Sequence, residues 1–154
     1  MAREIERKFL VADPAFLTGL AGTRCRQGYI ATHNGAAVRL RVIGERAFIT
    51  LKGKSEGISR AEYEYPVPVA DAEAMLDGLC DPPLIEKTRY LVEHGGMNWE
   101  VDVFSGDNNG LIVAEIELEA ENQPFEKPPW LGEEVSHDPR YFNFNLSRTP
   151  FKDW

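Results

Sequence analysis

Residues 4–9 read Glu4-Ile5-Glu6-Arg7-Lys8-Phe9, a stretch in which charged and apolar side chains alternate. In a β-strand successive side chains point to opposite faces, so Glu4, Glu6 and Lys8 share one face. Side chains two positions apart lie about 7 Å from each other, and two like charges at that distance repel by about 2 kcal/mol at an effective dielectric constant of 20. If this face is enclosed, it therefore requires a cation.

The same alternation recurs along the chain in runs that are separated by turn signals. The turns are predicted at Asn34-Gly35, Gly44-Glu45 and Gly95-Gly96. Proline at 66 and 68 indicates that one run ends there or lies at a sheet edge. With the first strand, the pattern predicts about eight strands, the others at residues 26–32, 37–43, 47–54, 59–69, 84–92, 98–104 and 111–119.

A few helices are expected beside these strands. Asp71 is a candidate N-cap for a helix over residues 72–79, which the Pro82-Pro83 pair ends. Short helices are expected at 14–20 and, after Asp138-Pro139, at 140–147. The rest of the tail from residue 120 is predicted to be irregular, with Trp130 and Leu131 as covering residues.

The charged side of these strands allows two interpretations. One is an open antiparallel sheet with a solvated face, which is common for a single strand of this kind. The other is a closed barrel with its charges inside, and an eight-stranded barrel has room for one small ligand. Paired charges on seven strands favour the barrel, because open sheets avoid like charges side by side.

The charges on this face include both signs, with an excess of acids. Carboxylates suit Mg²⁺ or Mn²⁺, and no His or Cys cluster favours zinc. Arginine and lysine from several strands suit a compact phosphate chain, so a metal-bound polyphosphate satisfies both sets. The nine acids are Glu4, Glu6, Glu62, Glu64, Glu100, Asp102, Glu115, Glu117 and Glu119, and the six bases are Lys8, Arg39, Arg41, Lys52, Lys87 and Arg89.

Length and composition limit the class of protein. The 154 residues fit a single domain, 1–154. A net charge of −8 argues against nucleic acid as a partner. No apolar run is long enough to span a bilayer and the first strand leaves no room for a signal peptide, so a cytoplasmic protein without membrane contact is expected. Cys25 and Cys80 are expected to stay reduced and to pack as small apolar residues.

Several segments in order resemble the CYTH superfamily, the triphosphate tunnel metalloenzymes. The matching residues extend from Glu4 to about Asn145. The segments are residues 4–10, 39–41, 50–52, 62–64, 86–90, 100–104 and 115–117. The resemblance implies a mainly β fold of the α+β kind, an eight-stranded antiparallel closed β-barrel, or tunnel, with a few flanking helices.

The resemblance also implies roles for individual residues. The metal, Mg²⁺ or Mn²⁺, would be held by Glu4, Glu6, Glu115 and Glu117. The substrate phosphates would be bound by Lys8, Arg39, Arg41, Lys52, Lys87 and Arg89. A second metal or a water-orienting role is assigned to Glu62, Glu64 and Asp102.

Tyr29 and Lys52 are the candidate catalytic residues. Tyr29 resembles a tyrosine that in some members of the family lies near a tunnel lysine and assists protonation of the leaving group or of water. The alternative is that Tyr29 is a barrel aromatic of the core, since tyrosine often fills strands.

The function expected from these residues is metal-dependent hydrolysis of a phosphoanhydride bond in a small linear triphosphate, inorganic tripolyphosphate first. Other members of the family act on thiamine triphosphate or nucleoside triphosphates, or are class IV adenylyl cyclases, and these remain alternatives. A binding module that retains polyphosphate without cleaving it is a further alternative, although anion capture alone does not require the carboxylates. The sequence leaves open the oligomeric state and the choice between Mg²⁺ and Mn²⁺.

Overall fold

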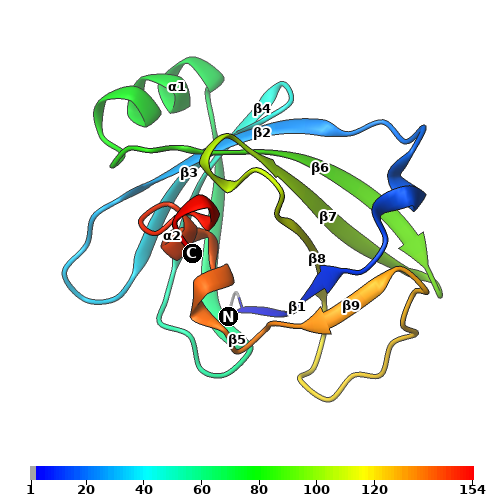
Figure 1. The fold of residues 1–154 in the computed structure, drawn as a ribbon. Coiled ribbons are helices and arrows are strands. Elements are labelled where there is room, and N and C mark those ends of the chain that lie inside the picture. The colour runs from blue at the N-terminus through cyan, green and yellow to red at the C-terminus, as the bar shows by residue number, and fades with distance from the viewer. Residues whose placement is uncertain (1–2) are drawn as a thin grey trace.

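The computed structural model describes residues 3–154, whose strands form one antiparallel sheet that closes on itself. The strand order is β5-β4-β3-β2-β6-β7-β8-β1-β9, and a further pairing of β5 with β1 closes eight strands into the barrel seen in Figure 1. The strands are β1 (Arg3–Val11), β2 (Thr23–Ile30), β3 (Ala37–Ile43), β4 (Arg46–Lys52), β5 (Ser59–Val67), β6 (Ile85–His94), β7 (Met97–Ser105), β8 (Ile112–Glu117) and β9 (Leu131–Glu134).

The predicted eight-stranded closed barrel is confirmed. Strand 37–43 was predicted with its observed bounds, and the other strands differ by a few residues at their ends. The closing contact is short: Arg3, Glu4 and Ile5 of β1 lie opposite Ala61, Arg60 and Ser59 of β5.

The ninth strand, β9, was not predicted and corrects the expectation of an irregular tail. It pairs with the C-terminal half of β1, where Phe9 lies opposite Glu134 and Val11 opposite Leu131. Four residues that include a glycine give almost no alternation to detect. Gly132 is needed for the close approach, because a Cβ atom there would lie 3.0 Å from the Leu10 carbonyl oxygen.

The helices differ from the predicted ones in detail. Helix α1 (Val69–Gly78) starts after Pro68, so the prediction of Asp71 as N-cap is wrong. Asp71 lies in the first turn, where its negative charge interacts favourably with the helix dipole. The 14–20 segment forms only the 3₁₀ turn η1 (Pro14–Leu17). Two further 3₁₀ turns are η2 (Gly106–Asn108) and η4 (Phe151–Asp153).

The predicted helix at 140–147 is interrupted. It consists of η3 (Pro139–Tyr141) and α2 (Asn143–Leu146), separated by Phe142 in an extended conformation. The predicted helix start at Asp138 is confirmed, since its carboxylate accepts a hydrogen bond of 3.1 Å from the Arg140 backbone N–H.

The apolar core lies largely outside the barrel wall. The outer side chains Leu40, Val42 and Ala47 pack against Ala72 and Leu76 of α1, which lies outside the strand ring in Figure 1. A second cluster, on the opposite wall, joins Phe9, Trp99, Val101, Ala114, Ile116, Leu118 and Trp130, with Phe16 of η1 stacked on Trp130. The inner face is thereby left to the charged side chains.

One end of the barrel interior is apolar. Ile85, Phe104 and Val113 share the inner face with the charged residues of β6, β7 and β8, and they pack against Tyr141 and Leu146. The C-terminal segment therefore closes this end of the inner face with apolar side chains.

Cys25 and Cys80 are both buried and unpaired, as predicted, although Cys25 lies on the inner face opposite Lys87 and not among apolar neighbours alone. Within residues 3–154, none of the helices has the length and apolar character needed to cross a bilayer.

Candidate active site inside the barrel

The predicted charged face lies inside the barrel. Strand pairing sets Lys8 opposite Glu115 and Glu6 opposite Glu117. Lys8, Lys87, Asp102 and Glu115 are 6%, 1%, 1% and 7% exposed, so the alternative of a solvated open sheet is wrong. Burial of a charge is costly unless it is paired, and the interior is accordingly crossed by ion pairs.

The main cavity of the interior has a volume of about 250 Å³. Five of the predicted phosphate-binding bases line it, namely Lys8, Arg39, Lys52, Lys87 and Arg89. Glu6, Glu115 and Tyr29 line it as well. The structure thus brings eight residues from six strands to one space.

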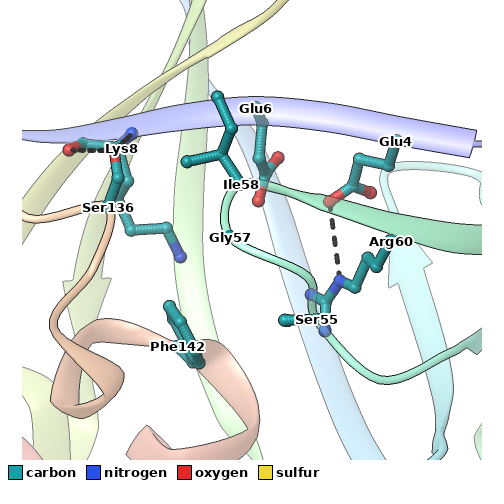
Figure 2. Close-up of a pocket in the computed structure, with 9 residues that line it drawn as sticks. All are labelled: Glu4, Glu6, Lys8, Ser55, Gly57, Ile58, Arg60, Ser136 and Phe142. Atoms are coloured by element: carbon teal, nitrogen blue, oxygen red, sulfur yellow. Dashed lines mark hydrogen bonds and ion pairs between the residues drawn. The ribbon is translucent and has the colours of Figure 1, made fainter. Parts of the chain in front are cut away.

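A smaller cavity of about 40 Å³ adjoins the first along β1. Figure 2 shows Glu4, Glu6 and Lys8 projecting from this strand into the cavity, opposite Arg60 and the loop at Ser55 to Ile58. Glu6 and Lys8 line both cavities, so the carboxylates and the bases share a continuous region.

The remaining predicted residues, Arg41, Glu62, Glu64, Asp102 and Glu117, are not among those that line these two cavities. Arg41 and Arg39 both pair with Glu64, at 3.5 and 3.4 Å, and Thr50 donates a hydrogen bond of 2.9 Å to the same carboxylate. The Nε atoms of both arginines are buried without a hydrogen-bond partner. This part of the predicted site holds donors that the protein itself leaves unsatisfied.

Glu6 and Glu115 form a carboxyl pair in the cavity. Burial and the nearby Glu115 and Glu4 carboxylates raise the pKa of Glu6 well above its usual value. Burial opposes ionisation of Glu115 too, but Lys8, Arg89 and Lys87 lower its pKa. Two buried acids that raise each other's cost of ionisation in one cavity favour a shared proton or a cation between them.

The acid cluster fits a hard divalent cation by the chemistry of its donors. Glu4, Glu6 and Glu115 supply carboxylate oxygens alone, the donors that suit Mg²⁺ and Mn²⁺. In the described part of the chain, no three acidic, His or Cys side chains already converge in ligand geometry. Glu117 lies at the end of β8, where its side chain is exposed in part; partial burial of the carboxyl group, together with Glu4 and Glu100, raises its pKa.

Lys52 connects the acidic and basic parts of the interior. Its ammonium group lies 3.0 Å from Glu4 and 3.4 Å from Glu62. Burial and the nearby Arg39 lower the pKa of Lys52 to about 8, although Glu4 opposes this change. Lys52 is therefore a cation that loses its charge within reach of ordinary pH.

A second network joins β6 and β7. Arg89 donates two hydrogen bonds to Asp102, at 2.8 and 2.9 Å, and one of 2.8 Å to Glu100. Lys87 pairs with the same Asp102 at 2.9 Å. Burial would raise the pKa of Asp102, but Lys87 and Arg89 lower it, so this carboxylate stays ionised between two cations.

Tyr29 faces the cavity and is 5% exposed. Its hydroxyl accepts a hydrogen bond of 3.2 Å from the Gln27 side chain, and its ring packs edge-on against Phe144. Burial raises the pKa of Tyr29, while Arg39 and Lys8 lower it less strongly. The phenol is thus protonated at neutral pH beside two cations.

The sequence reasoning missed Arg60 and the C-terminal segment. Arg60 lines both cavities and lies 3.9 Å from Glu4. Its position two residues before Glu62 on the same strand gives the signal that would have found it. The main cavity is also lined by four residues of the C-terminal segment, Phe142, Asn143, Phe144 and Asn145. The tail has no alternating pattern from which they could have been predicted.

Comparison with known proteins now places the chain in a family. A family model of the CYTH domain matches residues 2–147. The chain belongs to the CYTH family. The resemblance inferred from the sequence is therefore confirmed.

CYTH relatives of known activity are similar over their whole length. An inorganic triphosphatase of Acetivibrio thermocellus is 49% identical over 154 residues, covering 100% of this chain and 99% of that protein. An inorganic triphosphatase of Nitrosomonas europaea is 43% identical over 149 residues, covering 94% and 96%.

Solved structures of other proteins have a similar fold. The crystal structure of the inorganic triphosphatase NE1496 has a TM-score of 0.66 and 40% identity, covering 93% of this chain and 96% of that one. A structure from Bacillus halodurans, at 17% identity and a TM-score of 0.61, shows likeness of fold alone.

Proposed function

We propose that this protein is a divalent-metal-dependent hydrolase of a small linear triphosphate, with inorganic tripolyphosphate as its substrate. Water attacks a terminal phosphorus, the phosphoanhydride bond breaks, and the products are diphosphate and phosphate. The observation that carries the proposal is the joint presence of five of the predicted phosphate-binding bases, together with Glu6 and Glu115, in one cavity of about 250 Å³. The two inorganic triphosphatases at 49% and 43% identity support the choice of substrate.

The bases hold the phosphate chain in this proposal. Arg39 and Arg89 offer forked donors that match phosphate oxygens, and Lys8, Lys52 and Lys87 act as point charges. Phosphoryl transfer needs positioning and charge neutralisation more than it needs covalent chemistry. Arg41, which is paired with Glu64 and is not in the cavity lining, is assigned to one end of the phosphate chain, next to Arg39.

The acids hold the metal in this proposal, with Glu4, Glu6, Glu115 and Glu117 as ligands. When bound, Mg²⁺ or Mn²⁺ neutralises phosphate charge and acidifies a water molecule. Glu62, Glu64 and Asp102 keep Lys52, Arg39 and Lys87 in place through ion pairs. A second-metal role for these three acids is the alternative.

Tyr29 and Lys52 are assigned to the leaving group. The Tyr29 hydroxyl accepts a hydrogen bond from Gln27, which leaves its own proton free to be donated into the cavity. A protonated Lys52 neutralises the negative charge that develops on the departing diphosphate oxygen.

A substrate panel tests the proposal. Purified protein is assayed for phosphate release from tripolyphosphate, thiamine triphosphate, ATP and long-chain polyphosphate, each with Mg²⁺, with Mn²⁺ and with EDTA. We expect tripolyphosphate to give the highest kcat/KM and EDTA to abolish the reaction. Binding of tripolyphosphate without release of phosphate under any metal condition would instead identify a non-catalytic binding module.

A further inference from the structure

The C-terminal segment, residues 141–145, is placed against the barrel interior beside lysines from two distant strands. The Tyr141 carbonyl oxygen accepts a hydrogen bond of 3.1 Å from the ammonium group of Lys8. The Asn143 side-chain oxygen accepts one of 3.2 Å from the ammonium group of Lys87. Two residues of one short segment thus contact two of the proposed phosphate-binding lysines.

Each lysine ammonium group has three N–H donors and no acceptor. Lys8 directs one donor toward Glu115, at 3.5 Å, and another to Tyr141. Lys87 directs one toward Asp102, at 2.9 Å, and another to Asn143. Since both lysines line the main cavity, the third donor of each is the one available to a ligand there.

Asn143 and Asp102, the two partners of Lys87, differ in charge and in their other contacts. Both oxygens of Asp102 already accept hydrogen bonds from Arg89, so Lys87 shares this carboxylate with another cation. The Asn143 oxygen accepts its hydrogen bond from Lys87. It is also neutral, so it fixes the ammonium group without adding a negative charge that would repel phosphate.

We propose that Asn143 is a positioning residue for substrate binding: its amide oxygen fixes the Lys87 ammonium group so that the third N–H points at a phosphate oxygen in the cavity. This inference rests on the proposed function and deepens it by naming a residue that acts through Lys87. A lysine on a flexible four-carbon stem gains most from such a second acceptor, because its head group is otherwise free to rotate about one partner.

A double-mutant cycle tests the proposal. Asn143→Leu, Lys87→Met and the double variant are compared with the unmodified protein by calorimetric binding of tripolyphosphate in EDTA and by steady-state kinetics with Mg²⁺. We expect Asn143→Leu to raise Kd and KM about tenfold and to change kcat less than twofold. In the Lys87→Met background the same substitution should have almost no further effect, because its target is gone. Asn143→Ala removes the same acceptor and replaces Asn143→Leu if that variant does not fold.

Ser147→Ala is the matched control. The Ser147 hydroxyl donates a hydrogen bond to the Phe144 carbonyl within the same helical segment, and the residue is not in the lining of the cavity. We expect this variant to keep the original Kd and KM. Equal losses in Ser147→Ala and Asn143→Leu would show a general loosening of the segment and would overturn the positioning role.

Other outcomes separate this inference from the proposed function. An unchanged Kd in folded Asn143→Leu, or additive losses in the cycle, would overturn the role of Asn143 while tripolyphosphate hydrolysis by the unmodified protein stands. Failure of the unmodified protein to hydrolyse tripolyphosphate would overturn the proposed function, and the binding cycle in EDTA would still decide whether Asn143 acts through Lys87.

Discussion

The ammonium group of Lys52 on β4 lies 3.0 Å from the carboxylate of Glu4 on β1. These residues are 48 positions apart in the chain and meet only because β5 closes the ring against β1. The contact joins a residue proposed to bind phosphate to one proposed to bind metal. A substitution of either residue should therefore affect both phosphate binding and metal binding.

Substitution of Lys52 should weaken substrate binding strongly. We expect Lys52→Met to reduce kcat/KM for tripolyphosphate by about ten- to 100-fold at pH 7, because a hydrogen bond to a charged group contributes about 1.5–3 kcal/mol. Lys52→Arg, which keeps a positive charge, should retain more activity. Lys127→Met, at an exposed position outside the cavities, is the control. Unimpaired kinetics in folded Lys52→Met protein would contradict the assignment.

Glu6→Gln should separate stability from activity. The pKa of Glu6 is raised in the folded protein, so ionisation of Glu6 costs stability as the pH rises above the unfolded value of about 4.5. In EDTA at pH 7 we expect the variant to melt about 2–4 °C higher, which corresponds to about 1 kcal/mol. Its Mg²⁺-dependent turnover should fall to a small fraction of that of the unmodified protein.

Glu93→Gln is the control for this experiment, since Glu93 is exposed on β6 and outside both cavities. It should change neither the melting temperature in EDTA nor the turnover. Near-normal activity of folded Glu6→Gln would count against Glu6 as a metal ligand.

Metal and substrate should stabilise the protein together. A ligand that binds only the folded state at 100 times its Kd adds about 2.7 kcal/mol to the free energy of unfolding. We expect Mg²⁺ plus excess tripolyphosphate to raise the melting temperature by more than the sum of the two separate shifts, since each neutralises charges that oppose the other. Differential scanning fluorimetry measures this, and purely additive shifts would indicate independent sites.

The ion pair that fastens β9 to β1 should make stability depend on acid pH. Arg7 donates to both oxygens of Glu134, and the Ser136 hydroxyl donates to the same carboxylate at 2.6 Å. These bonds hold the pKa of Glu134 below its usual value. The stabilisation is therefore complete above about pH 4.5 and is lost as the pH falls through the folded pKa.

We expect Glu134→Gln to lower the free energy of unfolding by about 0.5–1 kcal/mol at pH 7, a modest amount because the pair is partly exposed. The difference from the unmodified protein should shrink below pH 4.5. Urea unfolding at pH 7 and pH 3.5 measures it, and a difference that is equal at both values would rule out Glu134 ionisation as the cause.

The prediction of the barrel succeeded where the signal is local. Each strand shows its own alternation of charged and apolar side chains. The strand at residues 37–43 and the inward direction of Glu4, Glu6 and Lys8 could therefore be predicted from the sequence. The strand β9 and the split of the last helix at Phe142 depend on contacts with β1 and the interior, and no local pattern encodes them.

The sequence by itself determined which side chains share the inner face, because strand geometry fixes their direction. Only the tertiary structure decided which of them meet. It sets Lys52 against Glu4, places Glu6 beside Glu115, and brings Arg60 and Asn143 into the site. The physical reason is that these pairings depend on how the sheet closes and where the C-terminal segment packs, and both arise from contacts between residues far apart in the chain.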